Sequence, residues 1–369
     1  MKLSAAQRGA VRDIEAICSR EADSRTLRRR VAERLSRLVY WDAVCFGTID
    51  PWTMLVTDDL SYGVPPHGYA RAAHNEYFVD DLHKIAALAR SATRVGILSQ
   101  APREQQEASH RVRTILPTID ARYEARVACV ADGQCWGVIS MFRNGDKDDF
   151  SSADAALLHA VSAPLAAGLR RAACRPDASA GVTVGKAGPG VLILGPRNET
   201  LAANDAARYW LDELTPAQLQ RHGELPYAVH QVAARAQAHI ADPDRSGRAP
   251  DAYARVRSRA GRWVTVHAAP VDGGLIAGTG TSVVLEAAPA SDIMEMLMSA
   301  YGLTRREREV LERVIAGTPS SAVAAQLCIS VNTVQDHLKS IFAKVGVRRR
   351  GQLVAHLLEE HYLPSAGTQ

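Results

Sequence analysis

The residues best suited to recognition chemistry lie in "SVNTVQDHLKSIFAKVGV", residues 330–347, which has the pattern of one amphipathic helix ending at Gly346. At 100° per residue its apolar side chains form one stripe: Val334, Leu338, Ile341 and Val345. The other side of the helix carries side chains that donate or accept hydrogen bonds: Asn332, Thr333, Gln335, Asp336 and Lys339. A merely solvated surface needs only Glu and Lys. The stretch therefore predicts a surface that recognises a hydrogen-bonding partner.

This polar side carries the groups that distinguish base pairs in the major groove of DNA. Gln335 can pair with adenine through two hydrogen bonds, Asp336 can accept from the amino group of cytosine, and Lys339 favours guanine. Phosphates would repel Asp336 unless a base or a bridging water compensates it, so Asp336 adds selectivity at the expense of non-specific attraction. Ser330 is expected to cap the helix through an N–H near Asn332 or Thr333.

The flanking residues are suited to the phosphate backbone. Residues 300–352 contain nine Lys or Arg against four Asp or Glu, although the net charge of the chain is only +4. Candidate phosphate contacts are the cations beyond the apolar stripe and the start of the preceding helix, whose amides could bind a phosphate: Lys344, Arg348, Arg349, Arg350, Ser320 and Ser321. Two short helices joined by a tight turn form a helix-turn-helix. Taken alone, this pattern leaves an ordinary helical bundle with a polar surface open.

A longer match favours the DNA-binding interpretation. The stretch "YGLTRREREVLERVIAGTPSSAVAAQLCISVNTVQDHLKSIFAKVGVRRRGQLVAHLL" resembles the DNA-binding domain of LuxR-type transcriptional regulators. The matching positions are Leu303, Thr304, Arg306, Glu307, Glu309, Val310, Leu311, Gly317, Ala324, Leu327, Ser330, Thr333, Val334, His337, Lys344, Gly346, Val347 and Arg350. The resemblance implies DNA contacts at Thr333, Gln335, Asp336 and Lys339. Ala322 and Val323 stand where the family has Glu-Ile, which removes a carboxylate expected to bond the first helix.

The rest of the chain predicts further domains. At 369 residues, of which 47% are hydrophobic, the chain is long enough for two to three. We expect a multidomain α+β fold with GAF-like and PAS-like antiparallel-sheet sensor domains, followed by an all-α four-helix helix-turn-helix domain. The expected parts are 1–175 (GAF-like sensor domain with an N-terminal helix), 176–189 (linker), 190–287 (PAS-like domain), 288–299 (connecting helix) and 300–369 (DNA-binding domain).

The pattern of the first part is similar to a GAF-type domain over residues 24–172. Helical spacing is expected within 8–39, 66–91, 103–116 and 152–171, and strands within 42–50, 53–58 and 93–99. Two further strands flank the turn at Asp132-Gly133. The run Arg28–Arg30 is expected to lie on a solvated helix face.

Residues 190–286 are similar to a PAS-type domain. Strand, turn and strand are expected over 190–205, short and long helices over 206–214 and 225–240, and three strands over 253–271 and 281–288. Asn204 lies where such domains often keep an Asn after the second strand.

Catalytic chemistry is not indicated. The sequence has no G-x-S-x-G, H-E-x-x-H or P-loop motif, so we expect no enzyme, no catalytic residues, no metal site and no cofactor, with cofactor-binding residues unknown. His67, His74, His83 and His110 share one helical region without metal-ligand spacing, which favours solvated or hydrogen-bonded histidines. Six scattered cysteines are typical of reduced, buried thiols; Cys129 and Cys135 flank the hairpin turn, and a redox switch there is the less favoured alternative. A phosphoacceptor receiver pattern is absent.

These features predict a cytoplasmic transcriptional regulator with no membrane span, because the apolar stretch 155–169 is short and the start "MKLSAAQRGAVRD" has no apolar core. Its expected partners are double-stranded promoter DNA, a second copy of the chain in a homodimer, and a small-molecule effector or a partner of the sensor domains. Two alternatives stay open. One is a constitutive regulator whose sensor folds only dimerise; the other is a small-molecule enzyme or signalling protein with secondary DNA binding.

Overall fold

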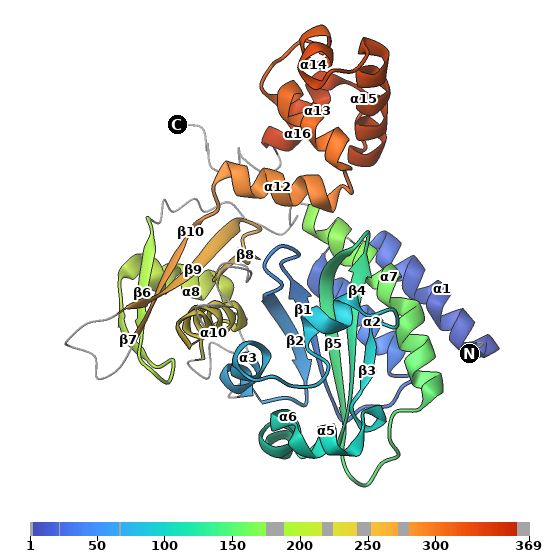
Figure 1. The fold of residues 1–369 in the computed structure, drawn as a ribbon, viewed down its shortest axis with the longest axis vertical. Helices are drawn as coiled ribbons and strands as arrows, with labels where there is room; N and C mark the ends of the chain where they lie inside the picture. The colour runs from blue at the N-terminus through green and yellow to red at the C-terminus, as the bar shows by residue number, and fades with distance from the viewer. Residues whose placement is uncertain are drawn as a thin grey trace. The chain divides into compact units, whose positions relative to one another are not determined.

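A computed structural model describes residues 3–21, 23–65, 68–174, 188–215, 224–241, 252–271 and 280–359. The chain divides into two compact units, Met1–Leu169 with Lys186–Ala287, and Arg170–Gly185 with Ala288–Gln369. The first unit contains two five-stranded sheets and the second is helical (Figure 1). The expected linker 176–189 lies almost entirely outside the described residues, so the domain boundaries stay predictions.

The first sheet is antiparallel, with strand order β2-β1-β5-β4-β3. Its strands are β1 (Ala43–Ile49), β2 (Val56–Tyr62), β3 (Val95–Ile97), β4 (Tyr123–Ala131) and β5 (Gln134–Arg143). The predicted hairpin is confirmed, since β4 and β5 meet at Asp132 (φ 49°) and Gly133 (φ 77°). Positive φ at both central residues gives a turn whose twist matches that of the strands.

Three helices, α1 (Ala5–Arg20), α2 (Ser24–Leu35) and α7 (Ser152–Cys174), cover one face of this sheet (Figure 1). The Ser162 hydroxyl of α7 donates to the Ala128 carbonyl of β4 at 2.7 Å. Arg28 was expected on a solvated face, and this was wrong. Its side chain is 1% exposed, donates to the Phe46 carbonyl at 2.8 Å and pairs with Asp58.

Among the described helices, α7 alone is long and apolar enough to cross a membrane by length and composition. It has 23 residues, so it is longer than the expected apolar stretch 155–169, and length alone does not exclude a span. Several of its apolar side chains are fully buried within the first unit: Leu157, Leu158, Val161, Leu165 and Ala166. One side of α7 is therefore packed in the interior of the first unit.

The other face of the first sheet carries the short helices α3 (Tyr69–Phe78), α4 (Ile85–Arg90), α5 (Arg103–Ala108) and α6 (His110–Thr114), with the 3-10 turns η2 (Leu98–Gln100) and η3 (Leu116–Ile119). The helical structure expected over 66–91 is present as two helices, α3 and α4. The chain turns between them at Asp81, which accepts from the N–H groups of Leu82 and Arg111 at 2.8 and 2.9 Å, and at His83, which has a φ of 51°.

The second sheet repeats this strand order as β7-β6-β10-β9-β8. Its strands are β6 (Gly190–Leu194), β7 (Thr200–Ala203), β8 (Tyr253–Arg257), β9 (Trp263–Val271) and β10 (Gly280–Ala287). Two helices, α8 (Asp205–Leu214) and α10 (Tyr227–Ala241), lie between these strands in the sequence. Asn204 caps α8 by accepting from Ala207 N at 2.8 Å, and it also accepts from Val191 N at 3.0 Å. This asparagine therefore holds the helix to the sheet.

The helix α10 lies between the two sheets, against α3, β2 and β9 (Figure 1). The Gln231 side chain on α10 accepts a hydrogen bond from the Tyr77 hydroxyl on α3. A buried ion pair also joins the sheets, since Arg255 of β8 donates to both carboxylate oxygens of Asp50, at 3.0 and 3.1 Å. Leu55, between β1 and β2, belongs to the apolar core of the second sheet. The two sheets are thus joined by α10, by this ion pair and by Leu55.

Among its described residues, the second unit contains the end of α7 and the helices α12 (Ala290–Ala300), α13 (Arg305–Ile315), α14 (Ser320–Leu327), α15 (Val331–Val345) and α16 (Arg350–Glu359). Val310, Leu311 and Val314 of α13 are buried, and Gly317 follows the helix with a φ of 83°. The predicted fold class, mixed α+β with antiparallel sheets followed by an all-α domain, is confirmed.

Candidate nucleic-acid interface

A tight turn joins α14 and α15. Cys328 ends α14 in the left-handed region (φ 53°, ψ 46°), and the Ile329 N–H returns to the Ala324 carbonyl at 3.0 Å. Ser330 then begins α15, where its hydroxyl accepts from Thr333 N at 3.0 Å, so the predicted N-cap is confirmed. Gly346 ends the helix with a φ of 81°, a conformation that glycine adopts without strain.

The apolar side of α15 is the stripe that the sequence predicts. Its buried residues are Val334, Leu338, Ile341 and Val345. The helix packs through them against α13 and α14. Because four buried positions fix the rotation of the helix about its axis, they also determine which residues face away from the domain.

The polar residues of α15 face outward. Asn332, Gln335, Asp336 and Lys339 are exposed and Thr333 is half-buried. The Lys339 ammonium pairs with the Asp336 carboxylate at 3.1 Å, with both side chains about three-quarters exposed. An exposed ion pair of this kind contributes only about 0 to 1 kcal/mol, so its members can exchange partners readily. Gln335 donates to the Ser320 hydroxyl at 3.3 Å.

The first residues of α14 adjoin this edge. Pro319 is the N-cap and makes no side-chain capping hydrogen bond, and it is followed by the half-buried Ser320 and the exposed Ser321. The N–H groups of a first helical turn have no partner within the helix, and they bind anions well. Ser320 and Gln335 are thus brought together, with an uncapped helix start beside them.

The four predicted phosphate contacts beyond the stripe differ in their surroundings. Arg348 and Arg349 are exposed. Lys344 donates to Glu307 at 2.6 Å and to the Gly302 carbonyl at 3.0 Å. Arg350 donates to the Val314 and Thr318 carbonyls at 3.0 and 2.9 Å, which satisfies the end of α13. Lys344 and Arg350 therefore hold helices together within the domain.

Sequence reasoning missed Glu307 as the centre of this domain. Its side chain accepts from Ser340 at 2.6 Å, from Lys344, and from the Thr304 backbone N–H in a capping box. Burial alone would raise the pKa of Glu307, but these hydrogen bonds lower it to about 2. The pattern Thr304-x-x-Glu307 signals the start of a helix. The contacts with Ser340 and Lys344 carry no local signal, because they lie more than thirty positions away in the sequence.

The departure from the family pattern at Ala322 and Val323 is accommodated. Val323 is fully buried, so it keeps the apolar contact of the position, while Ala322 is half-buried. Of the carboxylates in α13, Glu307 pairs with Lys344 on α15, and Glu309 pairs with Arg305 and Arg306 on its own helix. The link between α13 and α15 thus involves no residue of α14.

Solved structures resemble the whole chain only weakly. Escherichia coli SdiA aligns over 95% of this chain and 96% of its own, with 11% identity and a TM-score of 0.33. A free methionine-R-sulfoxide reductase from Neisseria meningitidis covers 47% of this chain and 96% of its own, with 16% identity and a TM-score of 0.28. Scores this low do not establish a common fold.

Sequence comparisons are more specific for the helical domain. The family described as bacterial regulatory proteins, luxR family, matches residues 301–357. A probable transcriptional regulatory protein NarL of Mycobacterium tuberculosis is 32% identical over 89 residues, which are 24% of this chain and 37% of that relative. The chain therefore spans little more than a third of the length of this relative.

The spore germination protein GerE of Bacillus subtilis is 41% identical over 56 residues, which are 15% of this chain and 76% of GerE. Residues 301–357, which the family model matches, contain the helix-turn-helix with the exposed edge of α15 and the capping box of α13. On this match and that of the family profile, the chain belongs to the luxR family of bacterial regulatory proteins.

Proposed function

We propose that the chain is a cytoplasmic, sequence-specific DNA-binding transcriptional regulator. One observation carries the proposal: the polar edge of α15 is solvent-exposed within a helix-turn-helix of luxR-family sequence. Gln335, Asp336 and Lys339 present an amide, a carboxylate and an ammonium, which together are complementary to several base edges of the major groove. The printed names of the NarL relatives, which call them transcriptional regulatory proteins, support the same function.

The proposed contacts divide into two kinds. The α15 residues Asn332, Thr333, Gln335, Asp336 and Lys339 contact bases, whereas Ser320, Ser321, Arg348 and Arg349 contact phosphates. Lys344 and Arg350 add positive charge near the duplex while their donors bind inside the domain. Their contribution to affinity is therefore mainly through the stability of the domain.

We further propose a homodimer, because one helix reads few base pairs and two half-sites separated by ~34–36 Å supply the missing specificity. The unit with the two sheets responds to a small-molecule effector or a partner, and α12 connects that unit to the DNA-binding helices. The proposal involves no membrane and no catalysis.

The test is selection of duplexes from a random pool by the full-length chain, followed by affinity measurements on selected and random duplexes. We expect the selected duplex to bind at least about a thousandfold more tightly at physiological salt. Light scattering of the complex gives the number of chains per duplex. Equal affinity for selected and random duplexes would remove the claim of sequence specificity.

Gln335→Ala, with Gln326→Ala as a matched control, tests the reading edge itself. Gln326 is an exposed amide on α14 that bonds Arg313 at 3.1 Å and lies outside the proposed interface. Only the first substitution should reduce the preference for the selected duplex. If both reduce it equally, the edge of α15 is not what reads the sequence.

A further inference from the structure

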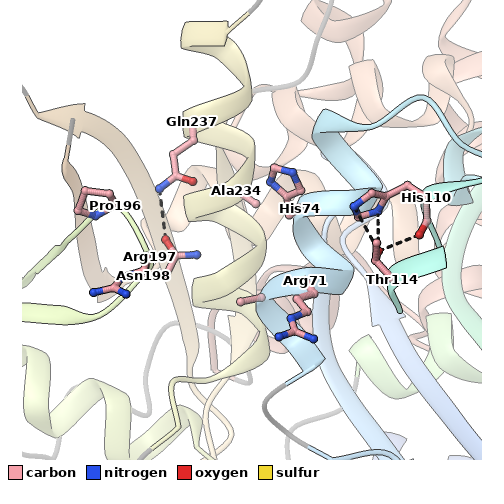
Figure 2. Close-up of a pocket in the computed structure, with 10 residues that line it drawn as sticks. Arg71, His74, His110, Thr114, Pro196, Arg197, Asn198, Ala234 and Gln237 are labelled. Carbon is pink, nitrogen blue, oxygen red and sulfur yellow. Dashed lines mark hydrogen bonds between the residues drawn. The ribbon is translucent and has the colours of Figure 1, made fainter. Parts of the chain in front are cut away.

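A cavity of about 360 Å³ lies within the first unit, between α3, α6, the turn from β6 to β7, and α10 (Figure 2). Pockets for small ligands begin at about 300 Å³, so this volume suits a small metabolite. The helices α3 and α6 belong to the half with the first sheet, and the turn and α10 to the half with the second. A ligand in this cavity would touch both halves.

Among the described residues that line the cavity, the permanently charged side chains are two arginines, Arg71 and Arg197. Two histidines, His74 and His110, also line it, and no lining residue is Asp or Glu. Neither guanidinium has a hydrogen bond or an ion pair with any described residue. A hollow lined by one sign of charge concentrates the field and attracts counter-ions. The lining therefore favours an anion.

Three of these groups lie on the side formed by α3 and α6. The rings of His74 and His110 are 6.4 Å apart between centroids, and both residues line the cavity (Figure 2). Arg71 precedes His74 by three positions, which places both on one face of α3. Burial and the neighbouring His110 lower the pKa of His74. A negative charge between the two rings would reverse that effect. Arg197 lies apart from them, on the turn between β6 and β7 (Figure 2).

The opposite wall is α10, which contributes Ala234 and Gln237. Gln237 is held by Asn198 at 3.2 Å and by Thr281 at 3.0 Å. His230, one turn before Ala234 on α10, is 5% exposed and has no hydrogen-bond partner for either ring nitrogen among the described residues. A buried imidazole without partners is unfavourable. A movement of α10 that gave the His230 imidazole a hydrogen-bond partner would therefore be favourable.

We propose that this cavity binds a small organic anion with a carboxylate or phosphate group, held by Arg71, His74 and His110. Since α10 packs on both halves of the unit, an anion seated against α3 and α6 changes how α10 lies between the sheets. The proposal of anion binding depends only on the cavity and the residues that line it. The role of the anion as effector rests on the proposed regulatory function.

The test uses the full-length chain with two probes, succinate and inorganic phosphate, each at constant ionic strength balanced with KCl. Calorimetric titration and the Tm are measured for the native protein and for the double variant Arg71→Gln with His74→Gln. Both residues are exposed, so this variant is expected to fold, and circular dichroism checks it. Arg90→Gln, which removes an exposed arginine of α4 outside the cavity, is the matched control.

We expect at least one probe to bind the native protein and the control alike, and to bind the double variant about tenfold more weakly or worse. Phosphate raises the Tm of many proteins because it is excluded from their surfaces. Comparison with the double variant therefore distinguishes binding at the cavity from this general effect. Binding of succinate alone assigns a carboxylate ligand, and binding of phosphate alone assigns a phosphate ligand. Equal responses of all three proteins to both probes, or no binding by any of them, would overturn the site.

Binding of the selected duplex by the same proteins separates the two claims. A native protein that binds the duplex but neither anion contradicts the cavity proposal and leaves the DNA-binding function intact. One that binds an anion through Arg71 and His74 but no duplex contradicts the DNA-binding function and supports the anion site.

Discussion

Glu307 on α13 and Lys344 on α15 form an ion pair of 2.6 Å across the two helices that pack behind the DNA-facing edge. The carboxylate is 5% exposed and also accepts from Ser340 of α15. The pair therefore fixes where α15 lies against α13. The sequence predicted Lys344 as a phosphate contact, but in the structure its ammonium binds Glu307 and the Gly302 carbonyl inside the domain.

Lys344→Ala should destabilise the helical unit by roughly 1 to 3 kcal/mol, because it leaves the Glu307 carboxylate buried with fewer partners. Hydrogen exchange of α13 and α15 in the full-length chain measures the loss. Arg348→Ala removes an exposed cation nearby and should leave the exchange rates unchanged. Equal protection in the native protein and the Lys344 variant would show that the pair does not stabilise the domain.

Base reading and phosphate binding should separate in two other substitutions. Gln335→Ala should lower the affinity for the selected duplex by roughly 1 to 3 kcal/mol and relax the preference at one base position. Arg348→Ala should weaken all duplexes about equally and reduce the slope of log K against log salt by about 1. Titrations at several salt concentrations measure both effects. The division between base reading and phosphate binding is contradicted if both variants lose affinity for selected and random duplexes in the same proportion.

Glu307 should also make the helical unit sensitive to acid. Its pKa is about 2 in the folded chain, below the ordinary value of 4.5. A lowered folded-state pKa adds stability that is complete above about 4.5 and is lost as the pH falls from there toward 2, in total roughly 3 kcal/mol. Glu307→Gln should flatten this dependence of the exchange rates of α13. An unchanged acid response in the variant would assign it to other carboxylates.

The buried pair of Asp50 and Arg255 predicts a non-additive result. Arg255→Met alone should cost about 3 to 5 kcal/mol in urea unfolding, because the Asp50 side chain is fully buried and loses its counter-charge. Adding Asp50→Leu should recover much of that loss, since the uncompensated charge is removed. A double variant that loses the sum of the two single losses would contradict this.

The six cysteines should differ sharply in reactivity. Cys328 is exposed, whereas Cys129 and Cys135 are buried in the first sheet, where burial raises the pKa of Cys135 to about 12 and that of Cys129 well above its ordinary range. Because the thiolate is the reactive form, iodoacetamide should label Cys328 first in the native chain. Mass spectrometry of timed samples reads the sites. Early labelling of Cys129 or Cys135 would revive the redox switch that the hairpin position suggested.

Local signals predicted much of this molecule. The apolar stripe of α15, the Ser330 cap and the Asp132-Gly133 hairpin depend on neighbouring residues, and each is confirmed. Contacts between distant segments gave no such signal. Asp50 and Arg255 are 205 positions apart, and no local sequence pattern at either position predicts that they pair. For the same reason Lys344 appeared to be free for phosphate in the sequence, although Glu307 holds it.

The position of α10 has a consequence for how the chain can be cut. The helix supplies Val229, Val232 and Ala233 to the core of the second sheet, while its Tyr227 packs on the core of the first. A fragment that ends before residue 190 would leave the surface under α10 bare, and a fragment that begins there would carry α10 with one side exposed to water. We expect neither half to fold alone as a soluble fragment. Residues 1–287 are therefore the smallest fragment that we expect to fold.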